Sequence, residues 1–320
     1  MKKLVALLCA ACLLLSVVPA FAATPKPIVT IPYDQLPATL DGQHHYLLLC
    51  LDQYNGTLYK GPIPKGAGNP YGYTDGMVLL TMDTRAHRIM LTSFIRDALV
   101  NTPTGTIGRL NNIYRLHGGP EQTMKTISEH IGVKIEKYIL FDFNQIAAII
   151  DSLGGVDITI TPEEASYLIR YPLTRTQTTP AVTKAGTYRF HGRAAVIYMR
   201  IRKVGGHGDF MRTQRVRTVL STLADTCRAM TYDDARRLLD TIVEHSLATN
   251  MTLEEMVEAT NIAYGLTDCI IEELRIPPDG AVHPLTHAGM ATQELDWEAC
   301  RAAMEDFLSS SFLVMDDEDD

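Results

Sequence analysis

Short apolar runs alternate along the chain with longer segments of helical periodicity. The runs predict strands at residues 46–52, 77–82, 88–95, 138–141, 156–160 and 270–276. Apolar residues at helical spacing predict helices at residues 143–153, 232–245, 253–263 and 296–308, and around Met124, Ile127 and Ile131. Strands interleaved with helices indicate an α/β fold, here a layered α-β-α single domain with a central mixed β-sheet.

The segment at residues 193–217 carries most of the candidate chemistry. Residues 195–202 alternate in the manner of a strand, which would place Arg200 and Arg202 on one face. A glycine-rich turn at residues 205–208 then reverses the chain. The pattern therefore predicts a strand that ends in two arginines pointing the same way.

A helix is expected after this turn, with Asp209 as its N-cap and with Arg212 and Arg215 in its first turns. Free N–H groups at a helix N-terminus attract oxyanions, and guanidinium groups bind phosphate in a bidentate manner. Because this helix end would face Arg200 and Arg202, it indicates a phosphate site. The alternative is that the arginines form ordinary surface ion pairs.

A predicted hairpin brings acidic and basic residues together. If its turn is centred near residue 85, antiparallel partners sum to about 170, so Asp75 lies opposite Ile95 and beside Arg96. If the preceding strand pairs antiparallel with the first strand of the hairpin, Asp52 and Asp75 share an edge of the sheet. Two carboxylates and an arginine are thus expected at one end of the sheet.

Length and charge restrict the class of partner. With 320 residues, 46% of them apolar, the chain can bury a large core. Its formal net charge of −8 argues against nucleic acid, because no basic excess is present to release counterions. Any anion site must therefore be a local basic cluster. The histidines and cysteines show no metal-site spacing.

Residues 1–23 are predicted to be a secretory signal peptide, since two lysines precede an apolar run that ends in small residues suited to cleavage. The alternative is an uncleaved anchor, because the run approaches the length that spans a bilayer. Either way, the protein is expected to be exported and to act on the extracytoplasmic side of the membrane or in the cell wall. Residues 24–42 are predicted to be a linker, and residues 313–320 an acidic tail.

The cysteines outside the predicted signal peptide are Cys50, Cys227, Cys269 and Cys300. Four cysteines permit three pairings, and nothing in the sequence selects one of them. Cys50 lies in the apolar run at residues 46–52, so it is expected to be a buried thiol.

Four sequence blocks, in order, carry a resemblance to a known family. They are TDGMVLLTMD with LTSFIRDALVNTP, RLNNIYRLHGGPEQTMKTI, FDFNQIAAIIDSLGGVDITI, and GTYRFHGRAAVIYMRIRK through GDFMRTQRVRTVL. On these blocks the chain resembles the LytR-CpsA-Psr (LCP) family, also called cell envelope-related transcriptional attenuator proteins. The resemblance implies a catalytic domain over residues 43–312 with an apolar cavity for a polyprenyl pyrophosphate lipid. It also implies transfer of the lipid-linked glycopolymer, such as teichoic acid or capsule polysaccharide, onto peptidoglycan at the membrane surface.

The resemblance also implies roles for residues of this sequence. Those implied in catalysis are Arg96, Asp97, Arg200 and Arg202. Those implied in substrate binding are Arg109, Asn111, Arg212, Gln214 and Arg215. Those implied as ligands of Mg²⁺ are Asp75 and Asp52. Phosphoryl transfer mainly needs charge on the phosphate oxygens to be neutralised, and guanidinium groups and Mg²⁺ both do this.

Two of these residues have a second interpretation. Asp97 is the candidate to accept the proton of an attacking sugar hydroxyl, and the alternative is a simple ion pair with Arg96. Asn111 either positions phosphate or substrate, or stabilises its own turn. The chain also departs from the family pattern twice, with Tyr73 where the family has an arginine and Val216 where it has a glutamine.

Three functions stay open on the sequence alone. The first is a Mg²⁺-dependent phosphotransferase that joins a lipid-linked glycopolymer to peptidoglycan. The second is a polyprenyl-pyrophosphate binding protein or pyrophosphatase of the cell envelope, which Tyr73 and Val216 favour. The third is a transcription regulator, which fits worst because the chain is acidic and lacks a basic recognition helix.

Overall fold

The computed structural model of the protein describes residues 24–64, 68–171, 180–206, 208–228, 230–266 and 268–310. At its centre is a six-stranded sheet with the strand order β10-β3-β2-β1-β6-β9. These strands are β1 (Gln43–Leu51), β2 (Thr74–Asp83), β3 (Arg88–Phe94), β6 (Lys137–Phe141), β9 (Ala248–Thr249) and β10 (Ile270–Ile276). Since β1 is antiparallel to β2 but parallel to β6, and β3 is antiparallel to β2 but parallel to β10, the predicted mixed sheet is confirmed.

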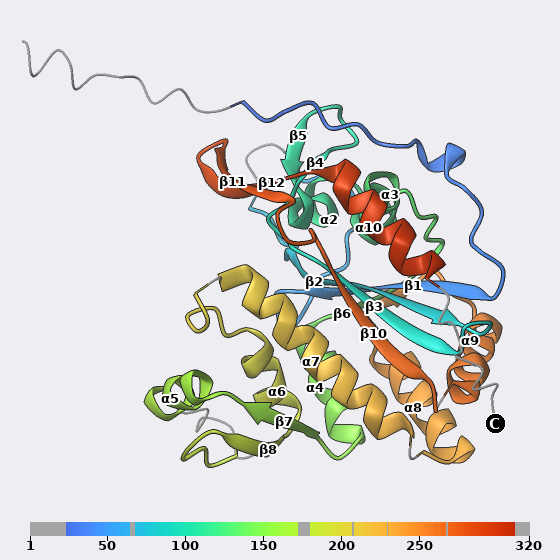
Figure 1. The fold of residues 1–320 in the computed structure, drawn as a ribbon, viewed down its shortest axis with the longest axis vertical. Helices are drawn as coiled ribbons and strands as arrows, with labels where there is room; N and C mark the ends of the chain where they lie inside the picture. The colour runs from blue at the N-terminus through green and yellow to red at the C-terminus, as the bar shows by residue number, and fades with distance from the viewer. Residues whose placement is uncertain are drawn as a thin grey trace, which may run out of the picture.

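Helices cover both faces of this sheet (Figure 1). One layer comprises α2 (Ile113–His117), α3 (Gly119–Ile131) and α10 (Trp297–Ser309). The other comprises α4 (Phe143–Ser152), α6 (Gly192–Met199), α7 (Gly208–Arg228), α8 (Tyr232–His245) and α9 (Leu253–Gly265). Alternation along β1 explains the layers, because Leu47 and Leu49 pack with the first layer and Tyr46 packs with the second. The predicted α-β-α arrangement is confirmed.

Shorter elements complete the described part of the fold. The two-stranded sheets are β4 (Leu99–Asn101) with β5 (Ile107–Arg109), β7 (Val156–Ile160) with β8 (Gly186–Phe190), and β11 (Val282–His287) with β12 (Met290–Leu295). The short helices are η1 (Tyr33–Gln35), η2 (Leu110–Asn112) and α5 (Pro162–Arg170). Helix α5 was not predicted from the sequence, although Thr161 and Glu164 form a capping box at its start.

The strand predicted at residues 195–202 is wrong, because most of it belongs to helix α6 and the rest to the loop that follows. An unbroken apolar run suits a buried helix and a buried strand equally, so the local pattern cannot decide between them. The segment instead forms a helix that packs against α4. The contact is so close at its first residue, Gly192, that a Cβ atom there would collide with the Ala147 carbonyl. The prediction that Arg200 and Arg202 share a strand face fails with it. Helix α7 begins at Gly208, so Asp209 lies within its first turn and is not its N-cap.

The predicted hairpin forms with a register one residue away from the expected one. Val78 opposes Ser93, where the sequence predicts Thr92. If the same register is extended to the open end of the hairpin, Asp75 faces Arg96. The shift therefore brings the two charged residues closer together than the sequence indicated.

The segment at residues 24–42, which was predicted to be a linker, packs on the domain. The Ile31 amide donates to the Glu129 carbonyl (3.0 Å), and the Tyr33 hydroxyl donates to the Ile135 carbonyl (2.6 Å). The predicted signal peptide and acidic tail lie outside the described residues. Within the described ranges, no helix is both long and apolar enough to span a bilayer.

Candidate anion-binding site

Three arginines from distant parts of the chain meet at one carboxylate oxygen. Asp75 Oδ2, at the start of β2, accepts hydrogen bonds from Arg96 (2.6 Å), Arg202 (3.0 Å) and Arg212 (2.9 Å). Arg96 follows β3, Arg202 follows α6, and Arg212 lies in the first turns of α7. The Asp75 side chain is only 8% exposed and that of Arg212 only 5%, whereas the Arg202 side chain is 45% exposed. The expected meeting of Asp75 and Arg96 is confirmed, and Arg202 and Arg212 join them, while the catalytic role of Arg96 and Arg202 stays a prediction.

The arginines control the ionisation of Asp75. Burial alone would raise the pKa of this carboxyl group, but Arg212, Arg96 and Arg202 together lower it below its ordinary value. Asp75 is therefore ionised at neutral pH and fixes the three guanidinium groups around itself. Each guanidinium group has five N–H donors in a planar fork, which suits the oxygens of a phosphate.

The second oxygen of Asp75 differs from the first. Asp75 Oδ1 is buried and accepts no hydrogen bond from the described residues. Asp52 follows β1 at the same end of the sheet. Its Oδ1 accepts a hydrogen bond from the Tyr73 backbone amide (2.8 Å), and its own backbone amide donates to the Tyr73 carbonyl (2.9 Å). Burial raises the pKa of Asp52 in spite of the Tyr73 amide, and the charge of Asp75 raises it further. The predicted meeting of Asp52 and Asp75 at one edge is confirmed.

These two carboxylates suit a metal ion that keeps much of its own hydration. Among the described residues, no group of three or more His, Cys, Asp or Glu side chains is placed to hold a metal ion. Mg²⁺ does not need such a cage, because it retains several waters and binds one or two carboxylates together with phosphate oxygens. The unpartnered oxygen of Asp75, next to Asp52, fits this requirement.

Asp97 lies between two arginines. Its carboxylate is 3.0 Å from Arg109 Nη1 and 3.5 Å from Arg96 Nε. The ion pair considered as the alternative role of Asp97 is therefore present, and it connects Arg109 to the Asp75 cluster through Arg96. Asn111 lies close by, because its backbone amide donates to the Arg96 carbonyl (3.1 Å). Its side chain is buried.

Arg200 lies over aromatic rings at the C-terminus of α6. Its guanidinium carbon is 4.5 Å from the centroid of the Phe143 ring and 6.0 Å from that of the Tyr54 ring. Arg193 is seven residues earlier, so it shares this face of α6, and it lies 4.2 Å from the Tyr54 ring. Arg193 was not predicted to belong to the site, because the pattern of residues 195–202 predicted a strand and not a helix. Helical spacing from Arg200 is the signal that would have found it.

Arg215 does not face the cluster, which corrects the expectation that it binds substrate, whereas Gln214 is exposed and its role in substrate binding stays a prediction. Arg215 is 1% exposed, and it donates to Glu164 Oε1 of α5 (2.7 Å) and to the Ile201 carbonyl (2.8 Å). Gln214 accepts a hydrogen bond from Arg217 on its own helix. Arg215 thus anchors α7 to α5, and this role was hidden because the sequence analysis did not predict α5.

A small cavity of about 60 Å³ lies beside the cluster. Its polar lining is Asp75, Arg200 and Arg212. Its apolar lining is Cys50, Gly76, Phe143, Ile146, Val196, Met199 and Val216. Burial, together with the nearby Asp142 and Asp75, raises the pKa of the Cys50 thiol, so this group stays protonated and acts as part of the apolar wall. The four described cysteines have free thiols.

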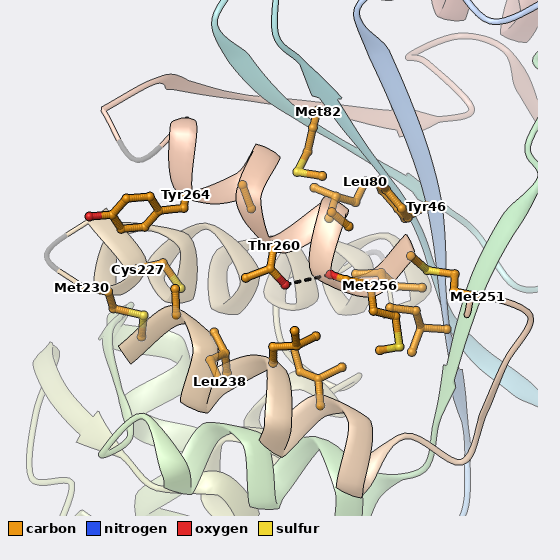
Figure 2. Close-up of a pocket in the computed structure, with 17 residues that line it drawn as sticks. Tyr46, Leu80, Met82, Cys227, Met230, Leu238, Met251, Met256, Thr260 and Tyr264 are labelled. Carbon is orange, nitrogen blue, oxygen red and sulfur yellow. Dashed lines mark hydrogen bonds between the residues drawn. The ribbon is translucent and has the colours of Figure 1, made fainter. Parts of the chain in front are cut away.

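A larger apolar cavity of about 190 Å³ lies further along the same face of the sheet (Figure 2). Tyr46 and Leu48 of β1 and Met82 of β2 form one wall, and side chains of α8 and α9 form the other. Tyr46, Leu48 and Cys50 alternate along β1, so they point to one face. The four residue steps from Cys50 to Tyr46 span about 13 Å. The two cavities therefore lie in line, and the line begins at the arginine cluster.

Sequence comparison finds relatives along most of the chain. A model of the LytR_cpsA_psr family matches residues 45–302. Biofilm regulatory protein A of Streptococcus mutans is 26% identical over 192 residues, which are 57% of this chain and 45% of that protein. The polyisoprenyl-teichoic acid–peptidoglycan teichoic acid transferase TagV of Bacillus subtilis is 26% identical over 213 residues, which are 64% and 52% of the two chains. The chain thus spans about half the length of these two relatives.

Solved structures of several proteins share the fold. TagT bound to LI-WTA has a TM-score of 0.64 at 20% identity, with 83% of this chain and 89% of that chain covered. TagT with bound octaprenyl pyrophosphate lipid has a TM-score of 0.60 at 19% identity and the same coverage. Bacillus subtilis TagV has a TM-score of 0.62 at 22% identity, with 84% and 98% covered. These structures confirm the predicted α/β architecture, and the match over residues 45–302 shows that the chain belongs to the LytR_cpsA_psr family.

Proposed function

We propose that this protein transfers a glycopolymer from a polyprenyl pyrophosphate lipid to peptidoglycan, outside the cytoplasmic membrane. The observation that carries the proposal is the arginine cluster on Asp75 at one end of a line of apolar cavities. A polyprenyl pyrophosphate has the same two parts, a charged head and a long apolar tail. The name of TagV describes a teichoic acid transferase, and one TagT structure holds octaprenyl pyrophosphate. Both findings support this choice of substrate.

The apolar cavities would hold the tail. Burial of apolar groups contributes about 0.8 kcal/mol for each methylene removed from water, so a few isoprene units supply much of the affinity. Tyr46, Leu48 and Cys50 line a path along β1 that leads away from the cluster. The tail would therefore run between the sheet and the helix layer of α7, α8 and α9.

The arginines would hold the pyrophosphate. Asp75 keeps the guanidinium groups of Arg96, Arg202 and Arg212 in place before the substrate arrives, so little reorganisation is needed when charge moves onto the leaving phosphate. Arg200, which lines the small cavity, would contact the same group from the C-terminus of α6.

Mg²⁺ belongs to this proposal, with Asp75 Oδ1 and Asp52 as the residues that would hold it. The ion would neutralise charge on the phosphate oxygens. Removal of divalent ions with EDTA should abolish transfer, and added Mg²⁺ should restore it. Full activity in EDTA would remove Mg²⁺ from the proposal and leave the arginine site in place.

In the proposed reaction, a sugar hydroxyl oxygen of peptidoglycan attacks the phosphorus next to the sugar of the polymer. A new P–O bond forms, the P–O bond to the lipid phosphate breaks, and lipid monophosphate leaves. Asp97 would take the proton of the attacking hydroxyl and pass it to solvent. Its position 3.5 Å from Arg96 Nε keeps it next to the proposed phosphate site.

The test uses purified full-length protein with a polyprenyl-pyrophosphate-linked oligosaccharide, peptidoglycan and Mg²⁺. We expect equal amounts of lipid monophosphate and peptidoglycan-bound oligosaccharide. Arg96→Gln should remove both products. Arg85→Gln is the matched control, because Arg85 lies in the turn at the closed end of the same hairpin and its side chain is 71% exposed.

Two results would contradict transfer. Lipid monophosphate without polymer on peptidoglycan would identify a pyrophosphatase. Lipid that stays bound and intact would identify a binding protein. The substitutions Tyr73 and Val216, where the family pattern has arginine and glutamine, make both results worth measuring.

A further inference from the structure

Arg115 on α2 holds a charge that the site described above does not use. Its guanidinium carbon lies 4.3 Å from the centroid of the Tyr73 ring. Its Nε is buried and has no hydrogen-bond partner, and Arg115 forms no ion pair with the described residues. A stack on an aromatic ring holds a guanidinium group in place but does not neutralise its charge.

Tyr73 places this charge next to the two carboxylates. The Tyr73 amide donates to Asp52 Oδ1 (2.8 Å), and Tyr73 precedes Asp75 by two residues. Arg115 therefore approaches the Asp52–Asp75 edge from the α2 layer, whereas Arg202 and Arg212 approach it from the opposite layer.

Asn111 provides an independent sign that a ligand belongs on this side. It is 2% exposed, and its Oδ1 has no hydrogen-bond partner among the described residues. Its backbone amide donates to the Arg96 carbonyl (3.1 Å), which places it between α2 and the cluster. Asn111 and Arg115 are four residues apart in the continuous η2–α2 segment, so they lie on one side of it. A buried acceptor without a partner is costly unless a donor group of a ligand or a water satisfies it.

We propose that Arg115 binds a phosphate oxygen of the lipid-linked donor, as a second arm of the anion site that Tyr73 holds in position; this inference rests on the proposed function. Because one face of the guanidinium group covers the Tyr73 ring, its edge presents N–H donors to an oxyanion. The unpartnered Asn111 Oδ1 is an acceptor, so from the same side it would take a hydrogen bond from a hydroxyl of the attached sugar. The phosphate belongs either to the pyrophosphate head or to a phosphodiester of the attached polymer.

The experiment compares Arg115→Gln with the wild type and with Arg85→Gln. The probes are geranylgeranyl pyrophosphate, which has no polymer, and a donor that carries phosphodiester-linked sugars. A lost charge-assisted hydrogen bond should weaken binding about tenfold. A loss with both probes assigns Arg115 to the pyrophosphate, and a loss with the second probe alone assigns it to the polymer. Arg85→Gln should bind both as the wild type does.

Variants of Tyr73 separate positioning from fold. Tyr73→Leu removes the stack and should weaken binding about threefold, whereas Tyr73→Phe keeps the ring and should restore most of that loss. Thermal unfolding of each variant checks that it is folded. The inference is overturned if Arg115→Gln binds both probes like the wild type while Arg96→Gln binds neither. If Arg96→Gln binds both probes as tightly as the wild type does, the proposed function itself is wrong, and the inference about Arg115 is wrong with it.

Discussion

The two ends of strand β2 each carry an aspartate near arginine, but the two carboxylates have different surroundings. At the closed end of the hairpin, Asp83 Oδ1 accepts the amides of Arg85 (3.0 Å) and Ala86 (2.9 Å), and Oδ2 accepts from Gln43 (2.9 Å). Arg88 stands 3.7 Å from the same carboxylate. At the open end, three arginines share one oxygen of Asp75, and the other oxygen has no partner in the described part of the chain.

The difference shows which end of the strand supports the fold and which end is prepared for a ligand. Arg88 is fully buried, and it donates to Glu272 (2.9 Å) on β10, and to the Leu308 carbonyl (3.1 Å) at the end of α10. These contacts tie α10 and β10 to the hairpin. The Asp75 end instead gathers three guanidinium groups on one oxygen of the carboxylate and leaves the other oxygen without a partner in the described ranges, whereas both oxygens of Asp83 have partners.

The largest effect is expected at the structural end. Arg88→Met leaves Asp83 and Glu272 without their shared cation, and removal of one partner of a buried ion pair costs about 3–5 kcal/mol. Urea unfolding should show this loss in the free energy of unfolding. The fraction that stays folded should bind geranylgeranyl pyrophosphate as the wild type does. If Arg88→Met loses binding without a loss of stability, Arg88 serves ligand binding and the two ends of β2 do not differ as described.

The opposite pattern is expected at the Asp75 end. Arg96→Gln should lower kcat/KM for transfer by about 10²- to 10³-fold, the loss typical when one preorganised donor to a developing oxyanion is removed. The free energy of unfolding should change by less than about 1 kcal/mol, because Asp75 keeps Arg202 and Arg212. If this variant unfolds as readily as Arg88→Met, the two ends do not differ in the way described.

A smaller effect is expected on stability at acidic pH, and it comes from His130 in the layer of α3 and α10. His130 Nδ1 is 2.6 Å from the Thr126 carbonyl, to which it donates, and Nε2 accepts the Asn101 amide (2.9 Å). Burial lowers the pKa of His130 from 6.5 to about 4. The unfolded chain therefore takes up a proton below pH 6.5 that the folded chain does not take up until about pH 4, so stability falls as the pH falls through this range.

For His130 alone, the free energy of unfolding should be about 2 kcal/mol lower at pH 5 than at pH 7. Urea unfolding at the two pH values measures this difference. His130→Gln keeps an acceptor for the Asn101 amide but cannot titrate, so its pH dependence should be smaller by about that amount. An unchanged pH dependence in the variant would show that acid acts elsewhere.

The sequence predicted the sheet well because strong local signals define it. The strand at 156–160, the helix at 232–245 and the strand at 270–276 match the observed bounds to the residue. Hairpin register alone brought Asp75 close to Arg96, since pairing across a short turn is a local property. These parts of the site could be read from neighbouring residues.

The rest of the site depends on contacts between distant segments, which local patterns do not contain. Arg202 reaches Asp75 from the loop after α6, whereas the sequence pattern placed it on a strand that does not form, so this contact could not be read from the local pattern. Arg215 was assigned to the phosphate because its partner Glu164 lies on the unpredicted helix α5. Arg115 was missed because its contact with Tyr73 depends on how the chain before β2 lies on α2.

The most direct test is a crystal structure of the full-length protein with geranylgeranyl pyrophosphate. The account predicts phosphate oxygens in hydrogen-bond contact with Arg96, Arg202 and Arg212 at the open end of β2. It also predicts the prenyl chain along β1, under α8 and α9. A lipid bound on the other face of the sheet, or a head group bound away from Asp75, would contradict the assignment.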